Sequence, residues 1–154
     1  MAQLEVGYPN MRFIYMTGHL DGTGSGGNLN VRNEQIRAYY NAKDKVLFDF
    51  ADIERCNPDN IDYLDLGATD NCDYSGGNWA NEWCAVNPGS DLCDSCSCAR
   101  SQSLNCNLKA KAFWWMMARL AGWDPGNGGS SDSSDDSGTD GSGGGCFVRG
   151  AYGK

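Results

Sequence analysis

Two short apolar runs, separated by a helical pattern, limit most strongly what this chain can fold into. The first run is Met11–Met16, and the second lies within Lys45–Glu54 (KVLFDFADIE). Runs this short, with a β-branched and aromatic bias, are typical of strands buried on both faces. We therefore expect a strand over Val46–Glu54, a helix over Val31–Asn41, and a β–α–β unit whose right-handed crossover makes the two strands parallel.

Parallel strands joined in this way end at the same edge of the sheet, which is where open parallel sheets bind ligands. Polar side chains follow both runs, and the candidate catalytic residues are His19, Asp21, Asp52 and Glu54. A histidine close to a carboxylate can perform general acid–base chemistry. The alternative is that these are ordinary polar loop residues beyond the strand ends. Thr17 is the hydroxyl residue expected at a strand end.

Eight cysteines in 154 residues indicate an oxidising compartment. We therefore expect a secreted or cell-surface protein. The N-terminus has no features of a signal peptide, so we also expect that Met1 is not the natural N-terminus. No run reaches transmembrane length. Seven cysteines precede the C-terminal tail, so one is free, pairs with Cys146 or pairs between chains. The disulfide candidates are Cys56, Cys72, Cys84, Cys93, Cys96, Cys98 and Cys106. A zinc site built on Cys93, Cys96 and Cys98, with Cys106 or Cys84, is the alternative.

A long irregular region, Arg55–Asn105, carries turn signals throughout and holds most of the cysteines, which can staple it. Trp79 and Trp83 lie in this region and are candidates for stacking on sugar rings, although packing in a core is the favoured interpretation. Five acids here are weak candidates for calcium, but their spacing is not that of an EF-hand and favours a solvated loop. They are Asp59, Asp62, Asp65, Asp70 and Asp73. We expect no metal and no other cofactor.

Composition divides the chain into three parts: a globular domain over residues 1–123, a Gly/Ser/Asp linker over residues 124–145, and a C-terminal segment over residues 146–154. The formal net charge is −8, and no patch of clustered Lys and Arg is present. Because phosphate binding needs such clusters, nucleic acid is excluded as an expected partner.

The clearest helix is predicted over Asn107–Ala121, where apolar residues recur at helical spacing. The run around Phe13–Gly22, the strand over Val46–Glu54 and the sequence Asn105–Trp123 together resemble the C-terminal half of secreted bacterial SGNH, or GDSL-type, hydrolases. The resemblance covers roughly Leu4–Trp123. It implies a flavodoxin-like α/β fold, here incomplete at the N-terminus, with a long disulfide-stapled loop region. Members of this family include esterases, lipases and carbohydrate deacetylases that use a serine nucleophile.

The chain departs from the family at the catalytic motifs. The Gly-Asp-Ser nucleophile motif and the Gly-x-Asn-Asp block have no counterpart, and Asn105 stands where the family's catalytic histidine is expected. An amide cannot act as the general base for a serine near neutral pH. The resemblance therefore implies a domain of an ester- or glycan-acting family that lacks hydrolase activity in this chain alone. Asn105 remains a candidate ligand-binding residue. The tail resembles the Cys-Phe-Ile segments that follow glycine-rich linkers in some secreted bacterial proteins.

Two other classes of protein stay open. One is a cell-surface carbohydrate-binding module that uses Trp79 and Trp83. The other is a structural or filament-forming extracellular subunit, in which an uncovered sheet edge pairs with a neighbouring chain. The expected partners are thus a glycan or ester substrate, or a second copy of the chain.

Overall fold

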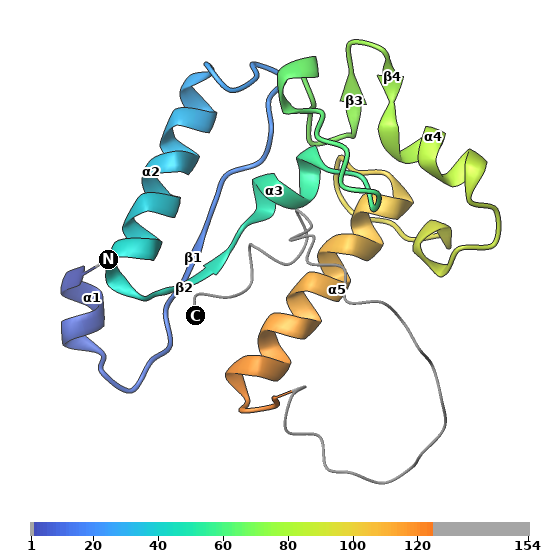
Figure 1. The fold of residues 1–154 in the computed structure, drawn as a ribbon. Helices are drawn as coiled ribbons and strands as arrows, with labels where there is room; N and C mark the ends of the chain where they lie inside the picture. Colours follow the sequence, from blue (N-terminus) through green and yellow to red (C-terminus); the bar gives the residue numbers. More distant parts are fainter. Residues whose placement is uncertain (1, 125–154) are drawn as a thin grey trace, which may run out of the picture.

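The fold is a computed structural model that describes residues 2–124, in which helices surround two short sheets (Figure 1). The helices and strands, in chain order, are α1 (Ala2–Gly7), β1 (Ile14–Met16), α2 (Asn28–Lys43), β2 (Val46–Phe48), α3 (Phe50–Arg55), η1 (Leu64–Leu66), β3 (Asp73–Tyr74), β4 (Gly77–Asn78), α4 (Trp79–Val86), η2 (Asp91–Cys93) and α5 (Ser103–Leu120). The predicted C-terminal segment and all of the predicted linker except its first residue lie outside the described residues. Within residues 2–124, no helix has the length and apolar character needed to cross a membrane.

The strands β1 and β2 pair in parallel, which confirms the predicted β–α–β unit. Ile14 lies opposite Val46 and Met16 lies opposite Phe48. Helix α2 makes the crossover between the strands and contacts both of them. In Figure 1 the two strands lie between α2 and α5. The structure is therefore a mixed α/β fold, with a parallel sheet to which residues 2–124 contribute two strands.

The second strand is much shorter than predicted. It ends at Phe48, and Phe50–Arg55 form helix α3 in place of the expected continuation. Asp49 is the reason, because its side chain accepts a hydrogen bond from Asp52 N and so caps the first turn of α3. A capped helix start satisfies backbone donors that a continuing buried strand would have to pair elsewhere. The prediction of a strand over Val46–Glu54 is wrong beyond Phe48.

The two helices that the sequence predicted, α2 and α5, were located correctly, but their bounds differ from the predictions. Helix α2 extends beyond the predicted Val31–Asn41 at both ends, and α4 contains the Trp79–Trp83 sequence. Helix α5 begins at Ser103, four residues before the predicted start. The earlier start places Asn105 inside the first turns of α5, where it is fully buried.

The main core lies where β2 and α3 meet α4 and α5. Trp79 is 0% exposed and belongs to this core together with Trp83. The other buried members are Phe48, Ile53, Cys72, Ala80, Leu104, Leu108, Ala112 and Met116. Both tryptophans of α4 therefore pack in the core, which was the favoured interpretation, and they do not present ring faces at the surface.

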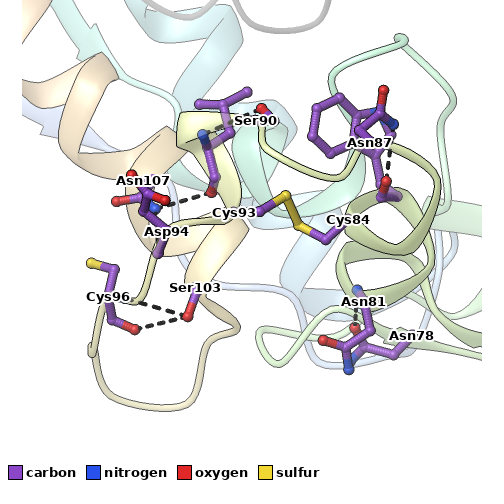
Figure 2. Close-up of a disulfide and its surroundings, with 12 residues drawn as sticks. Asn78, Asn81, Cys84, Asn87, Ser90, Cys93, Asp94, Cys96, Ser103 and Asn107 are labelled. Carbon is purple, nitrogen blue, oxygen red and sulfur yellow. Dashed lines mark hydrogen bonds between the residues drawn. A yellow bond between two sulfur atoms is a disulfide. The ribbon is translucent and has the colours of Figure 1, made fainter.

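Disulfides hold the loop between α4 and α5. Cys84 pairs with Cys93, which joins α4 to η2 (Figure 2). Cys98 pairs with Cys106 on α5. Figure 2 also shows Asn107 of α5 donating hydrogen bonds to this loop, at 2.9 Å to Asp94 O and 3.0 Å to Leu92 O. The long region after α3 is thus stapled by disulfides, as predicted.

Two of the predicted disulfide cysteines are free thiols. Cys72 is completely buried, and its Sγ accepts a hydrogen bond from Asn105 Nδ2 at 3.2 Å. Cys96 is partly exposed in the loop before α5, and its backbone is tied to Ser103 (Figure 2). Cys56, in contrast, is disulfide-bonded. The prediction that Cys72 and Cys96 form disulfides is therefore wrong: Cys72 instead packs in the core beside Asn105, and Cys96 lies in a loop whose backbone is hydrogen-bonded to Ser103.

Candidate functional site

The carboxyl ends of β1 and β2 meet through side chains. Thr17 follows β1, and its Oγ1 donates a hydrogen bond to Asp49 Oδ1 at 2.9 Å. The same hydroxyl accepts a hydrogen bond from Ala51 N at 2.9 Å, within the first turn of α3. Both side chains are buried. The shared strand edge that the parallel pairing predicted is thus present, and Thr17 and Asp49 form it.

Arg37 of α2 completes this group, which we call the strand-end cluster (Thr17, Arg37 and Asp49). Its guanidinium forms a bidentate salt bridge with Asp49, in which Nε lies 2.6 Å from Oδ2 and Nη2 lies 2.7 Å from Oδ1. A second carboxylate, Glu34, accepts from Arg37 Nη1 at 2.6 Å. Burial acts to lower the pKa of Arg37, but the two carboxylates outweigh it and the pKa is raised. Arg37 is therefore firmly cationic and engaged with protein groups.

Asp52 lies in the first turn of α3 and not beyond a strand end, which corrects its predicted position. Its side chain is only 16% exposed. Burial, and then the charge of Asp49, raise the pKa of Asp52 to about 6. Arg55 Nε lies 4.0 Å from Asp52 Oδ1, which is an ion pair but too long for a hydrogen bond. Asp52 is thus a carboxyl group whose charge the surroundings compensate incompletely.

A pocket of about 450 Å³ opens between α2, β2 and α3, and we call it the α2–α3 pocket. This volume falls within the range typical of small-molecule sites. The lining residues are Glu34, Arg37, Tyr40, Asn41, Leu47, Asp49, Asp52 and Arg55. The pocket therefore joins the strand-end cluster to Asp52, and nearly all of its lining is polar.

Glu54 serves the structure of the domain. It lies on α3, is 0% exposed, and its Oε2 accepts a hydrogen bond from Leu20 N at 2.6 Å. Its Oε1 pairs with Lys109 Nζ of α5 at 2.8 Å, and Lys109 also lies 4.3 Å above the ring of Phe50. Burial raises the pKa of Glu54 in spite of the lysine. Glu54 therefore ties the loop after β1 to α3 and α5.

His19 and Asp21 lie in the loop after β1, and both are exposed. Asp21 accepts hydrogen bonds from Thr23, which lower its pKa, and the charge of His19 contributes to that lowering. His19 also acts electrostatically on Glu54. Three of the four predicted catalytic residues, His19, Asp21 and Glu54, thus lie close enough for His19 to act electrostatically on both carboxyl groups. Asp52 interacts with Arg55 instead. Within residues 2–124, His19 makes no hydrogen bond to a serine hydroxyl, so no Ser–His pair is formed there.

The predicted ligand-binding residues all lie inside the domain. Trp79 and Trp83 are in the core, and Trp83 Nε1 donates to Asp59 Oδ2 at 2.9 Å. Asn105 is 0% exposed, and its amide nitrogen is bonded to Cys72. Access to any of these groups from solvent would need the core to open.

The predicted calcium candidates do not converge on one point. Most of them stabilise loops: Asp62 pairs with Arg55, Asp65 accepts from Ser25 N at 3.0 Å, and Asp73 accepts from Asn78. In the part of the chain that the structure describes, no group of three His, Cys, Asp or Glu side chains is placed to hold a metal ion. The described acids of this region thus act as turn and loop acceptors.

Sequence reasoning missed Arg37, Tyr40, Asp49 and Arg55. Asp49 could have been found, since it directly follows the short apolar run and precedes a possible helix start, which is typical of a capping aspartate. Arg37 and Tyr40 lie on the predicted helix three residues apart and so share a face. Nothing in the sequence indicated that this face looks toward α3.

The comparisons give no relative for this chain: no family model, no curated protein and no solved structure matches it.

Proposed function

We propose that this chain is an extracellular, disulfide-stabilised SGNH-hydrolase-like domain of an ester- or glycan-acting class, and that it lacks hydrolase activity on its own. The parallel pairing of β1 and β2 supports the proposal, because it brings polar side chains together at the strand ends, where such folds bind ligands. The disulfides support an oxidising location.

One observation carries the inactive assignment. At the strand ends, the Thr17 hydroxyl donates its proton to Asp49, and Asp49 is paired with Arg37. A hydroxyl that donates to an ionised carboxylate held by arginine has no basic imidazole to take its proton, so it is not activated as a nucleophile. The one histidine, His19, is exposed and makes no hydrogen bond to a serine within residues 2–124.

The test is turnover of p-nitrophenyl acetate by the purified full chain. Multiple turnovers are followed, because free thiols and lysines also react once with this ester; a Cys96→Ser variant removes the exposed thiol as a control. We expect a rate equal to that of buffer, with no change in His19→Ala. Turnover above buffer that His19→Ala abolishes would overturn the proposal.

A structural subunit is the second candidate, and exposed apolar groups on α5 favour it. Trp114 is 77% exposed and Phe113 is 52% exposed, and Phe113 also meets Phe48 of β2 at 6.2 Å between ring centroids. Exposed aromatic side chains next to a short sheet are typical of an interaction surface. Light scattering tests this candidate: large assemblies would support it, and a strictly monomeric chain would count against it.

A further inference from the structure

The partner of one disulfide-bonded cysteine lies outside residues 2–124. Cys56, at the end of α3, is disulfide-bonded. The other cysteines of the described part of the chain are accounted for as the pairs Cys84–Cys93 and Cys98–Cys106 and the free thiols Cys72 and Cys96. The sequence holds eight cysteines, and the one that remains is Cys146.

A pocket of about 280 Å³ opens beside Cys56, and we call it the Cys56 pocket. The turn after α3 supplies Cys56 and Pro58 to its wall, η2 supplies Leu92, and α5 supplies Leu108. These side chains make much of the wall apolar. The volume is just below the range of about 300–1,000 Å³ that is typical of small-molecule sites, so the pocket suits one or two side chains.

The walls of the Cys56 pocket are fixed by hydrogen bonds of the domain itself. Asn57 Oδ1 accepts from Asp59 N and from Ile61 N, each at 3.0 Å, which fixes the turn after α3. On the other side, Asn107 of α5 donates to Leu92 O at 3.0 Å and holds η2 against the helix. The pocket is therefore preformed, which lowers the cost of binding an occupant.

We propose that the Cys56 pocket is the docking site of this chain's own segment Cys146–Val148. Cys146 Sγ bonds to Cys56 Sγ, and the apolar side chains of Phe147 and Val148 cover the apolar wall. The sequence supports this occupant, because two apolar residues directly follow the one cysteine that remains for Cys56. The inference concerns the C-terminal segment and not the strand ends, so it goes beyond the proposed function and does not depend on it.

The chain between α5 and Cys146 is long enough for this bond. Along α5, the pocket residue Leu108 is separated from Leu120 by about 18 Å, at 1.5 Å per residue. Residues 121–145 can span up to about 80 Å when extended, so they can return along the helix to the pocket. A thiol joined by such a linker meets its partner at an effective concentration of the order of millimolar, which favours Cys146 over a cysteine of another molecule.

Formation of the bond is an oxidation of two thiols. The S–H bonds of Cys56 and Cys146 break, and one S–S bond forms. The two protons and two electrons go to a small disulfide such as glutathione disulfide, which becomes two thiols by exchange through a mixed disulfide. The covalent tie of the segment therefore depends on the thiol–disulfide balance of the surroundings.

The first measurement is non-reducing peptide mapping of the full chain by mass spectrometry. Free thiols are blocked with N-ethylmaleimide, and the unfolded chain is cut after Lys and Arg and before Asp. These cuts place Cys56 in the peptide 56–58 and Cys146 in the peptide 140–149. We expect these two peptides to be joined, in a chain that runs as a monomer on a non-reducing gel. A bond from Cys56 to any other cysteine, a Cys56 thiol, or a dimer joined through Cys56 would overturn the proposal.

The second measurement tests the docking of the apolar side chains. The same peptide map, taken in buffers of reduced and oxidised glutathione, gives the equilibrium constant for closing the Cys56–Cys146 bond. We expect Phe147→Ser combined with Val148→Ser to lower this constant about tenfold or more, because burial of the two side chains favours the closed form.

The matched control changes two other apolar residues of the same tail, Ala151→Ser with Tyr152→Ser, and should leave the constant unchanged. All four substitutions lie outside residues 2–124, and an unchanged urea midpoint verifies that the domain is intact. Equal constants for the Phe147 and Val148 variant and the unmodified chain would overturn the proposal. An equal loss in the control would also overturn it.

Discussion

Replacing Asp52 with asparagine should stabilise the domain at neutral pH but not in acid. The side chain is largely buried, and its pKa is raised from 3.8 to about 6 by burial and by the charge of Asp49. Between these two values the folded carboxyl keeps its proton while the unfolded one has lost it. The folded state therefore loses stability as the pH rises from about 4 to about 6, and the full cost is present above pH 6.

The magnitude follows from the size of the shift. About two pH units correspond to about 3 kcal/mol, which is an upper value for what Asp52→Asn gains above pH 6. Asparagine has nearly the same shape and does not titrate, so the difference in unfolding free energy between the two proteins isolates this one group. Urea unfolding at about pH 3.5, 5 and 7.5 measures that difference.

We expect the stability of Asp52→Asn, relative to the unmodified chain, to increase steadily across this pH range. Asp65→Asn is the matched control with the opposite sign. Hydrogen bonds from Ser25 lower the pKa of Asp65, so its replacement should cost stability at neutral pH and nothing well below its folded pKa. A difference for Asp52→Asn that stays flat with pH, or that falls, would refute the reasoning that the α2–α3 pocket desolvates this carboxyl.

Three further outcomes are expected. Lys109→Met should destabilise the domain by about 3 kcal/mol at neutral pH in urea unfolding, because it leaves the fully buried carboxylate of Glu54 unpaired. Lys111→Met removes a half-exposed surface pair with Asp91 and should cost under about 0.5 kcal/mol. Equal effects of the two substitutions would contradict this prediction. Replacing Cys84 and Cys93 together with serine should cost about 2–3 kcal/mol by the same assay, and no loss would show that this bridge does not constrain the unfolded chain. Burial raises the pKa of Cys72, so this thiol should resist iodoacetamide until the chain unfolds, whereas Cys96 should react in the folded state. Mass spectrometry of native and urea-treated samples tests this.

The sequence predicted the part of the fold that depends on hydrophobic periodicity. The two apolar runs, the helix between them and the long C-terminal helix were all located, because the spacing of apolar residues marks such segments in the sequence. The end of β2 was not predicted correctly, because an apolar residue such as Phe50 after Asp49 fits either a continuing strand or the start of a capped helix. Only the hydrogen bond from Asp52 N to Asp49 decides between them.

The candidate site could be predicted only in outline. The shared edge of parallel strands follows from topology, and polar residues there were expected. Which side chains reach that edge depends on how helices rotate against the sheet, and this is set by packing. Arg37 and Tyr40 line the pocket from α2, together with residues of β2 and α3, and this relation between distant segments is not carried by local patterns.

The parallel pairing of β1 with β2 underlies both the strand-end cluster and the α2–α3 pocket, and nuclear Overhauser contacts between the two strands test it most directly. The account predicts contacts between Ile14 and Val46 and between Met16 and Phe48. Contacts of Ile14 with Phe48 and of Met16 with Val46, which an antiparallel pair gives, would contradict it.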